Sequence, residues 1–354
     1  MICIKYVGID VGKRKCQTCI MEENATVIDE FVFSNDSDGI SLLLSKLDDE
    51  CRAVMESTGN YWVRIYDALE KNGIETKLAN PLMMKAVSYP SIKNDRKSAR
   101  TLARLLKADL IYECYVPSYE ARSARNLLRY RSSLVKIQTM VRNQTHALLD
   151  LYEVECQYKD ILGTHGLAVL STLKMNADDD LILHTHTKHL ECIKDCIDKI
   201  SARIAMRASD NEDVRILMSM TGIDYHTALL IATEIGDISR FPVPKHLVSW
   251  AGLCPNLNDS GESKYYGRIK KRECNRRVQW AIIQAAHVAT KHDRRMSEYY
   301  ERNAKRMHTN KAMVKVANKM MTIIWHMLTK KQLYMQKNDR LYHNKINKMS
   351  KLAN

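Results

Sequence analysis

The chain has 354 residues, of which 45% are hydrophobic and 27% are charged, and its formal net charge is +14. This composition is typical of a folded globular protein and excludes a disordered chain, and no apolar run approaches the roughly 18 residues that span a membrane. We therefore expect a cytoplasmic protein of two or three domains with reduced cysteines. The excess of lysine and arginine favours nucleic acid as partner, although any generally basic protein would share it.

The first predicted element is a short apolar strand at residues 6–13, with a single carboxylate, Asp10, in its middle. A buried carboxylate is costly without a cation beside it, so Asp10 is a candidate metal ligand, and a strand-end aspartate that caps a turn is the alternative. The elements that follow are strands at 16–21, 26–33, 52–56 and 75–79 and helices at 37–46 and 61–71. Three strands followed by alternating helices and strands predict an α/β sheet with a mixed edge, the order of a ribonuclease-H-like fold.

Two further acids stand near the ends of predicted elements. Glu56 ends a strand, and because the carboxyl ends of neighbouring strands line one crevice, Glu56 could face Asp10. Asp95 lies near the start of a helix predicted at 101–107, where the helix dipole favours its charge, and simple N-capping is the alternative role. Ser98 lies one helical turn later on the same face.

The segments GIDVGK, ESTGNYW and KNDRKSARTLA, in this order, resemble the RuvC-like DEDD domain of the insertion-sequence transposases of the IS-one-ten family, relatives of the Piv-type DNA invertases. The resemblance implies that the family's four acids fall on Asp10, Glu56, Asp95 and position 98, where this chain has Ser98. Carboxylates that bridge two Mg²⁺ (or Mn²⁺) ions would then support a phosphodiester exchange. A neutral serine is a weaker ligand, so the second ion should bind less tightly, or this copy is a decayed transposase.

One long helix is predicted from residue 120 to about 158, with a heptad repeat typical of a coiled coil. One line of the repeat is Leu127, Leu134, Val141 and Leu148, and the other is Tyr130, Ile137, Gln144 and Leu151. A second apolar line runs from Leu190 to Ile204. These two helices could pair antiparallel within one chain or serve as a dimer arm, and the family resemblance implies a coiled coil used in assembly.

Two helices joined by a tight turn are predicted around Gly222, after Ile216 and before an apolar helix at 227–235. This pattern is typical of a helix-hairpin-helix, in which the glycine lets backbone N–H groups approach a nucleic-acid phosphate. A plain helix turn would produce the same pattern, so both interpretations stay open.

A basic stretch lies between residues 262 and 277, with Tyr265 and Tyr266 among its charges. Its seven basic residues are Lys264, Arg268, Lys270, Lys271, Arg272, Arg276 and Arg277. Basic residues interleaved with aromatic rings suit backbone phosphates and stacked bases, and a solvated loop is the alternative.

The resemblance extends to the family's C-terminal transposase domain, in which a loop with a Ser-Gly pair supplies a nucleophilic serine. It places this serine at Ser260, with Ser263 a poorer candidate because no glycine follows it. No histidine stands beside Ser260, so we expect its activation from the metal site of the first domain. The alternative is a loop serine that makes a turn hydrogen bond. Cys274 stands where the family commonly has a glycine before the asparagine matched by Asn275.

The sequence predicts four regions: a RuvC-like catalytic domain at 1–112, a coiled-coil helical region at 113–210, a mostly α C-terminal transposase domain at 211–328 and a basic, partly disordered or nucleic-acid-bound tail at 329–354. The implied function is Mg²⁺-dependent transposition or site-specific recombination of an insertion sequence by a homo-oligomer (dimer or tetramer), guided by an RNA transcribed from the element. One alternative is a catalytically impaired DNA-binding relative. Another is an actin-like or sugar-kinase-type ATPase, because GIDVG also resembles a phosphate loop.

Overall fold

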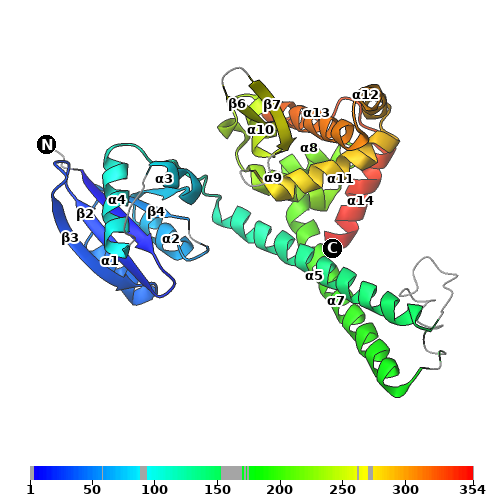
Figure 1. The fold of residues 1–354 in the computed structure, drawn as a ribbon, viewed down its shortest axis with the longest axis horizontal. Coiled ribbons are helices and arrows are strands. Elements are labelled where there is room, and N and C mark those ends of the chain that lie inside the picture. Colours follow the sequence, from blue (N-terminus) through cyan, green and yellow to red (C-terminus); the bar gives the residue numbers. More distant parts are fainter. Residues whose placement is uncertain are drawn as a thin grey trace. The chain divides into compact units, whose positions relative to one another are not determined.

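The computed structural model describes residues 4–57, 59–87, 94–152, 170, 173, 175–260, 263–269 and 274–353. The chain divides into two compact units, residues 1–116 and 117–354. The first is α/β and the second is mostly helical, which confirms the predicted fold class at that level (Figure 1). The finer division into four regions stays a prediction. Within the described ranges, every helix is too short or too polar to cross a membrane.

A mixed sheet of five strands in the order β3-β2-β1-β4-β5 forms the centre of the first unit. The strands are β1 (Lys5–Val11), β2 (Lys15–Met21), β3 (Val27–Ser34), β4 (Cys51–Glu56) and β5 (Glu75–Ala79). The helices are α1 (Ser37–Ser45), α2 (Val63–Lys71), α3 (Pro81–Val87) and α4 (Asp95–Lys107). β1, β2 and β3 pair antiparallel in chain order, and β4 and β5 extend the sheet in parallel from β1. The predicted mixed edge is therefore confirmed.

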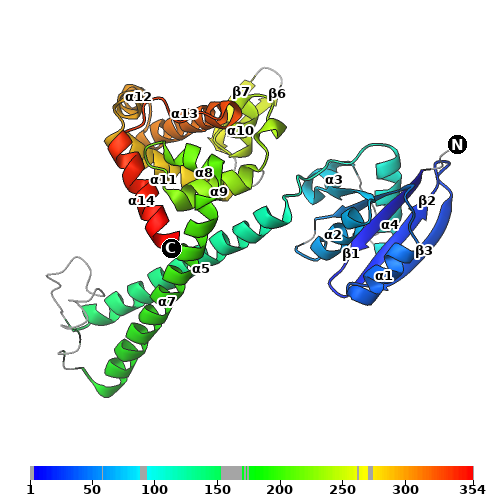
Figure 2. The same cartoon turned by 180° about the vertical axis from the view of Figure 1, so that it is seen from behind.

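Alternation of side chains along β1 distinguishes the two faces of the sheet. Val7 and Ile9 belong to a core that includes Leu43 of α1 and Ile65 of α2, so these two helices cover one face (Figure 2). Gly8, between them in the strand, turns to the other face, which α4 covers.

Helix α4 lies unusually close to β1. A Cβ atom added to Gly8 would lie 2.1 Å from the carbonyl oxygen of Ala99 and 2.6 Å from the backbone nitrogen of Ala103. Any side chain at Gly8 would therefore push α4 away from the sheet. Gly8 therefore sets the distance between α4 and β1 at a point two residues before Asp10 in the strand.

The second unit begins with two long helices that pair antiparallel within the chain. They are α5 (Tyr119–Asp150) and α7 (Ala177–Ser209). Arg131 donates from Nε to the Ser201 hydroxyl over 2.8 Å, and further along α5 the Thr145 hydroxyl lies 3.2 Å from Nδ1 of His186. Because a later residue of α5 meets an earlier residue of α7, the two helices run in opposite directions. The intrachain pairing is the first of the two arrangements that the sequence allows.

Only one of the two predicted heptad lines is buried along α5. Leu134, Val141 and Leu148 are each less than 10% exposed. The other line is exposed throughout, at Tyr130, Ile137, Gln144 and Leu151. A single partner helix covers only a narrow stripe of α5, so the second line remains on the surface of this chain.

The rest of the second unit is a helical domain with one β-hairpin. Its helices are α8 (Glu212–Met218), α9 (Tyr225–Ile235), α10 (Pro244–Trp250), α11 (Arg276–His292), α12 (Arg294–Ala304), α13 (Thr309–Lys330) and α14 (Asp339–Ala353), with a 3-10 turn at Ile238–Arg240. The hairpin consists of β6 (Pro255–Ser260) and β7 (Ser263–Ile269). Leu217, Ile231, Ile282 and Ile324, from four different helices, are fully buried in one shared core.

The C-terminal segment, predicted as a basic tail that is partly disordered or nucleic-acid-bound, is helical over Asp339–Ala353. Helix α14 packs on α7, α8 and α9, with Met349 only 1% exposed and Tyr342 and Ile346 packed against the core. Its apolar face is narrow and is flanked by lysines. The overall composition of the segment therefore does not indicate the amphipathic helix that forms. The expectation of disorder is wrong for residues 339–353.

Candidate active site

The sheet brings two of the predicted acids to the same end of neighbouring strands. β1 and β4 are parallel, with Ile9 opposite Met55, so Asp10 and Glu56 are the next residues in register. Neighbouring strands lie about 4.8 Å apart. Both acids are half-buried. The carboxyl ends of β1 and β4 therefore carry an adjacent pair of carboxylates, as the sequence predicts.

Both carboxylates lie on the face of the sheet that α4 covers. Gly8 is opposite Val54 in register, and Val54 belongs to the cluster that contains Leu102 of α4. Side chains two residues apart in a strand lie on the same face of the sheet. The side chain of Asp10 therefore lies on the same face as Gly8, and the side chain of Glu56 lies on the same face as Val54.

The first turn of α4 lies toward the strand end that carries Asp10. Ala99 rests on Gly8, whereas Leu106, later in α4, packs in a cluster with Tyr6, earlier in β1. Helix and strand therefore run in opposite directions, and the residues of α4 before Ala99 extend toward Asp10. These residues include Asp95, which is exposed, and Ser98, which is half-buried.

Asn94, rather than Asp95, is the N-cap of α4. Its side-chain oxygen accepts a hydrogen bond of 2.9 Å from the backbone N–H of Arg96. Asp95 is the first residue of the helix and is exposed, so the capping role considered for it belongs to its neighbour. This leaves the carboxylate of Asp95 available for another role near the sheet.

This edge of the sheet offers a metal ion two neighbouring carboxylates rather than the four acids that the family resemblance implies. Within the described ranges, no three His, Cys, Asp or Glu side chains gather closely enough to hold a metal ion. Two neighbouring carboxylates nevertheless fit magnesium, which is commonly held by one or two carboxylates with water and substrate phosphate as its other ligands. The assignments of Asp10, Glu56, Asp95 and Ser98 as metal ligands stay predictions.

Glu30 of β3, which the sequence analysis did not single out, holds α4 against the sheet. Its side chain is only 6% exposed and accepts hydrogen bonds from Arg100 Nη2 at 2.7 Å and from Arg96 Nε at 2.5 Å. The hydrogen bond from Arg100, with a smaller contribution from that of Arg96, lowers the pKa of Glu30 to about 2. Two of the basic residues in the KNDRKSAR segment therefore position α4 within the protein.

The predicted nucleophile lies at the end of a β-hairpin rather than in an irregular loop. Ser260 is the last residue of β6, and its backbone pairs with Ser263 at the start of β7. The side chains of residues 256–268, which include Ser260, Lys264 and Arg268, lie outside the described part of the structure, as do residues 270–273. Arg276 and Arg277 are exposed in the first turn of α11.

A buried polar network supports the helix that follows this hairpin. Asn275 is the N-cap of α11, where its side chain accepts hydrogen bonds from the backbone of Arg277 and Val278. Its side-chain nitrogen donates to Glu234 over 2.9 Å, and its backbone N–H donates to Trp250 over 2.9 Å. Asn275 therefore ties the end of the basic segment to the helical core.

Glu234 connects this network to the long helix α5. Its side chain is 7% exposed and lies 3.5 Å from Arg125 and 3.4 Å from Arg129. Arg125 also donates to the carbonyl oxygen of Thr233. The sequence offered one signal for this site, because Glu234 is the single charged residue in the apolar stretch at 227–235. Its arginine partners lie more than 100 residues away and had no local signal.

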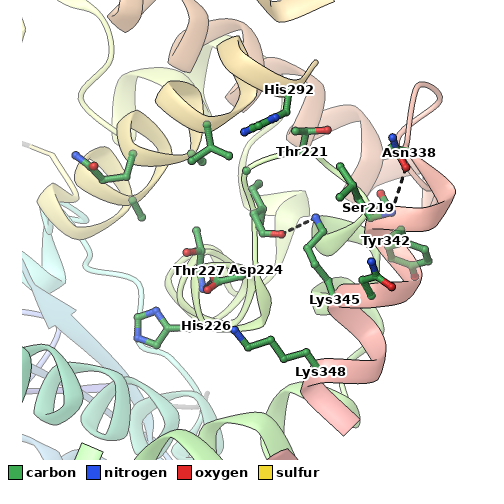
Figure 3. A pocket seen from close by; sticks show the side chains of 18 of the residues that line it. Ser219, Thr221, Asp224, His226, Thr227, His292, Asn338, Tyr342, Lys345 and Lys348 are labelled. Carbon is green, nitrogen blue, oxygen red and sulfur yellow. Dashed lines mark hydrogen bonds between the residues drawn. The ribbon is translucent and has the colours of Figure 1, made fainter. Parts of the chain in front are cut away.

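Gly222 occupies the predicted turn between α8 and α9, with a φ of +87°. A Cβ atom there would lie 2.3 Å from the carbonyl oxygen of Ala285 in α11. Packing against α11 therefore requires glycine at this position, independently of any ligand. The turn borders a cavity of about 640 Å³ whose other walls come from α9, α11 and α14, with Arg131 of α5 (Figure 3). A role of Gly222 in nucleic-acid binding stays a prediction.

Two transposase family models match successive parts of this chain. Residues 7–154 match the DEDD transposase family of IS110, and residues 214–301 match the Transposase IS116/IS110/IS902 family. The chain is 28% identical to the transposase for insertion sequence element IS1111A of Coxiella burnetii, over 94% of this chain and 91% of that protein. It is 24% identical to the pilin gene-inverting protein of Moraxella bovis, over 73% of this chain and 74% of that protein.

The matched families and relatives define the class of the protein as a transposase, with DNA-inverting proteins among its relatives. The transposase for insertion sequence element IS1328 of Yersinia enterocolitica is 22% identical over 92% of this chain and 97% of its own length. The two family matches occur in the expected order and include both the acids and Ser260. The chain belongs to the IS110 family of transposases, the IS-one-ten family of the sequence resemblance. These matches give no support to the ATPase alternative.

Proposed function

We propose that this transposase catalyses magnesium-dependent DNA strand exchange, with an acidic site on a RuvC-like sheet and Ser260 as the nucleophile. The observation that carries the proposal is the register of β1 and β4, which sets Asp10 beside Glu56 on the face covered by α4. Two carboxylates at the carboxyl ends of neighbouring parallel strands are a usual position for a catalytic site in an α/β sheet.

In the proposed reaction, the hydroxyl oxygen of Ser260 attacks a DNA phosphorus atom. A bond forms between that oxygen and phosphorus, and the bond from phosphorus to one sugar oxygen breaks. The serine loses its proton, and the departing sugar oxygen gains one. The product is a covalent protein–DNA intermediate, which the sugar hydroxyl of a second DNA strand can resolve by the reverse reaction.

The chain's own residues have separate roles in this scheme. Asp10 and Glu56 would hold the magnesium, which supplies positive charge to the attacking and leaving oxygens. Arg276 and Arg277, exposed in the first turn of α11 after the serine hairpin, would bind backbone phosphates. Their positive charge near the scissile phosphate would favour its position and stabilise the charge that develops there.

The direct test is a search for the covalent intermediate. Purified protein is incubated with element-end DNA, co-purified RNA and Mg²⁺, and a denaturant-stable protein–DNA adduct is located by peptide mass spectrometry. We expect the adduct on Ser260 and its loss in Ser260→Ala. Ser263→Ala is the matched control, because it removes a hydroxyl from the opposite strand of the same hairpin and should retain the adduct.

Two outcomes would contradict this assignment. An adduct on another residue would replace Ser260 as the nucleophile. Stable DNA binding without adduct or strand exchange would instead identify the chain as the catalytically impaired relative that Ser98 suggests.

We infer that an RNA transcribed from the element guides DNA recognition. The net charge of +14 suits two nucleic acids bound together. If the RNA guides the protein, then removing it with ribonuclease should abolish exchange at the specific site, and adding the transcript back should restore it. Undiminished specific exchange after complete RNA removal would exclude the guide.

We also propose that the helical arm formed by α5 and α7 joins copies of the chain. Ile137 and Met140 of α5 and Leu181 of α7 are 43%, 53% and 64% exposed and line one apolar groove on the arm. A second arm could cover this groove. An Ile137→Glu and Met140→Glu double variant should have a lower mass in solution than the native protein, whereas Lys136→Glu, on the same helix, should not. A native protein that is already monomeric would rule out this assembly.

A further inference from the structure

The ammonium group of Lys345 lies among three backbone carbonyl groups of the turn that joins α8 and α9. It donates to the carbonyl oxygen of Met218, to that of Met220 at 2.9 Å and to that of Ile223 at 2.9 Å. Figure 3 shows Lys345 extending from α14 to this turn, with a dashed line marking one of these bonds. One cation from the C-terminal helix therefore satisfies three carbonyl groups from a different part of the chain.

The position of these carbonyls explains why they attract a cation. Helix α8 ends at Met218, and the last carbonyl groups of a helix lack partners within it. They also carry the negative end of the helix dipole. The sharp turn at Gly222, with its positive φ, brings Ile223 back so that its carbonyl oxygen faces the same point. The turn thus builds a small, negatively polarised cup from backbone atoms.

The ammonium group matches this cup in charge and in donor number. A lysine ammonium has three N–H donors, and the cup provides three acceptors. Lys345 is half-buried, and this burial lowers its pKa to about 8, opposed by the nearby charge of Asp224. At neutral pH the group therefore remains mainly protonated and keeps its charge.

We propose that the turn between α8 and α9 is a monovalent-cation site made of backbone carbonyl groups, and that Lys345 occupies it as a built-in cation. Convergent carbonyl oxygens are the ligands with which proteins replace the hydration shell of K⁺. Ile223, which supplies one of the three carbonyl groups, and Lys345 both line the cavity of about 640 Å³. When the lysine side chain is shortened, a potassium ion with water as its remaining ligands can take the place of the ammonium.

The site couples the C-terminal helix to the helical turn. Lys345 bonds to residues more than 120 positions earlier in the chain. When Lys345 fills the cup, the turn and α14 hold each other in place. The site therefore requires either α14 with its lysine or a monovalent cation from solution.

Hydrogen exchange of the full chain at pH 7, read by mass spectrometry, tests the site in Lys345→Ala. The salts are 100 mM potassium, methylammonium or tetramethylammonium chloride, which share charge and ionic strength. In tetramethylammonium, which is too large for the cup and has no N–H donor, exchange in 212–224 and 339–353 should rise about tenfold over the native protein. Potassium and methylammonium should each restore most of the protection at 212–224, whereas 339–353, which has lost the side chain that ties it to the turn, should stay less protected. The native protein should respond equally to all three salts.

Lys348→Ala is the matched control, because it removes the same charge from an exposed position one turn later in α14. It should leave exchange at 212–224 unchanged in every salt. If Lys345→Ala loses protection equally in all three salts, then water fills the cup and the cation site is wrong. Unchanged protection in that variant would overturn the proposal as well. If Lys345→Ala does not fold, then Lys345→Gln, which keeps two donors without the charge, is measured in the same salts.

Discussion

The acidic half and the serine half of the proposed chemistry belong to different units and are held in place by different means. Asp10 and Glu56 are fixed by backbone pairing within a five-stranded sheet. Ser260 ends one strand of a two-stranded hairpin, and the helix after that hairpin is tied to the core by Asn275 and Glu234. Strand pairing thus fixes the backbone of the two acids, whereas polar side chains fix the helix that follows the serine hairpin.

The largest effect should come from Asp10→Asn, which removes a charge from the acidic half without changing its backbone. We expect DNA strand exchange to fall by about 10³-fold or more, because charge stabilisation at the reacting phosphate is lost. Strand exchange and the melting temperature are measured together. Asp109→Asn is the control, because Asp109 pairs with Lys77 at the far end of α4. Equal activity in the two variants would remove Asp10 from the site.

Asn275→Ala tests the support of the serine half. We expect adduct formation to fall by about 10- to 100-fold, because a displaced hairpin misaligns Ser260. Stability should fall by about 2 kcal/mol, because a helix cap and a buried hydrogen bond to Glu234 are lost together. Asn211→Ala is the control, since it removes the N-cap of α8 alone. If the two variants lose adduct formation equally, the support of the hairpin does not depend on Asn275.

The ion pairs of Glu30 with Arg96 and Arg100, which form the Glu30 clamp, predict that acid lowers the stability of the first unit. The pKa of Glu30 is lowered to about 2, so its stabilising effect is present above its unfolded value of about 4.3 and is lost as the pH falls toward 2. We expect a loss of about 1 kcal/mol in local stability between pH 5 and pH 3, allowing for the partly exposed arginines. Hydrogen exchange of α4 in the full chain at pH 5 and pH 3 measures it.

Two variants sharpen this test of Glu30. Glu30→Gln should already lack the protection at pH 5 and should lose much less between the two pH values. Glu75→Gln, which removes an exposed acid paired with Arg52 in the same unit, should behave as the native protein does. The same acid response in Glu30→Gln and the native protein would contradict the clamp.

The smallest effect should come from Ser98→Asp, which adds a carboxylate at the first turns of α4. We expect the Mg²⁺ concentration needed for half-maximal exchange to fall about threefold, because a carboxylate is a stronger ligand than a hydroxyl. A Mg²⁺ titration of strand exchange measures this change, and Ser98→Asn is the uncharged control. An unchanged Mg²⁺ requirement would show that position 98 does not contribute to metal binding.

The sheet and its two acids could be predicted from the sequence because their causes are local. The strand around Asp10 stands out as a short apolar run, and Glu56 follows the apolar residues Ala53, Val54 and Met55. Once β1 and β4 are parallel neighbours, the approach of Asp10 to Glu56 follows from register alone. The helix predicted at 101–107 begins earlier, at Asp95, because Asn94 provides a cap.

The contacts that position these elements could not be predicted, because each joins residues far apart in the chain. Glu30 meets its arginines 66 and 70 residues later, and Lys345 meets Met218 at a separation of 127. The polar and basic composition of β6 and β7 is also that of a solvated loop, so it does not predict strands. The sequence does not predict helix α14, because lysines surround the narrow apolar stripe around Met349.

The length of α5 sets a scale for contacts with nucleic acid. Its 32 residues span about 48 Å at the rise of an α-helix. A DNA duplex covers about 14 base pairs over that distance, more than one full turn. Two points on the same face of a duplex, one turn or about 35 Å apart, therefore both fall within reach of this single helix. Helix α5 is therefore longer than one helical turn of a DNA duplex.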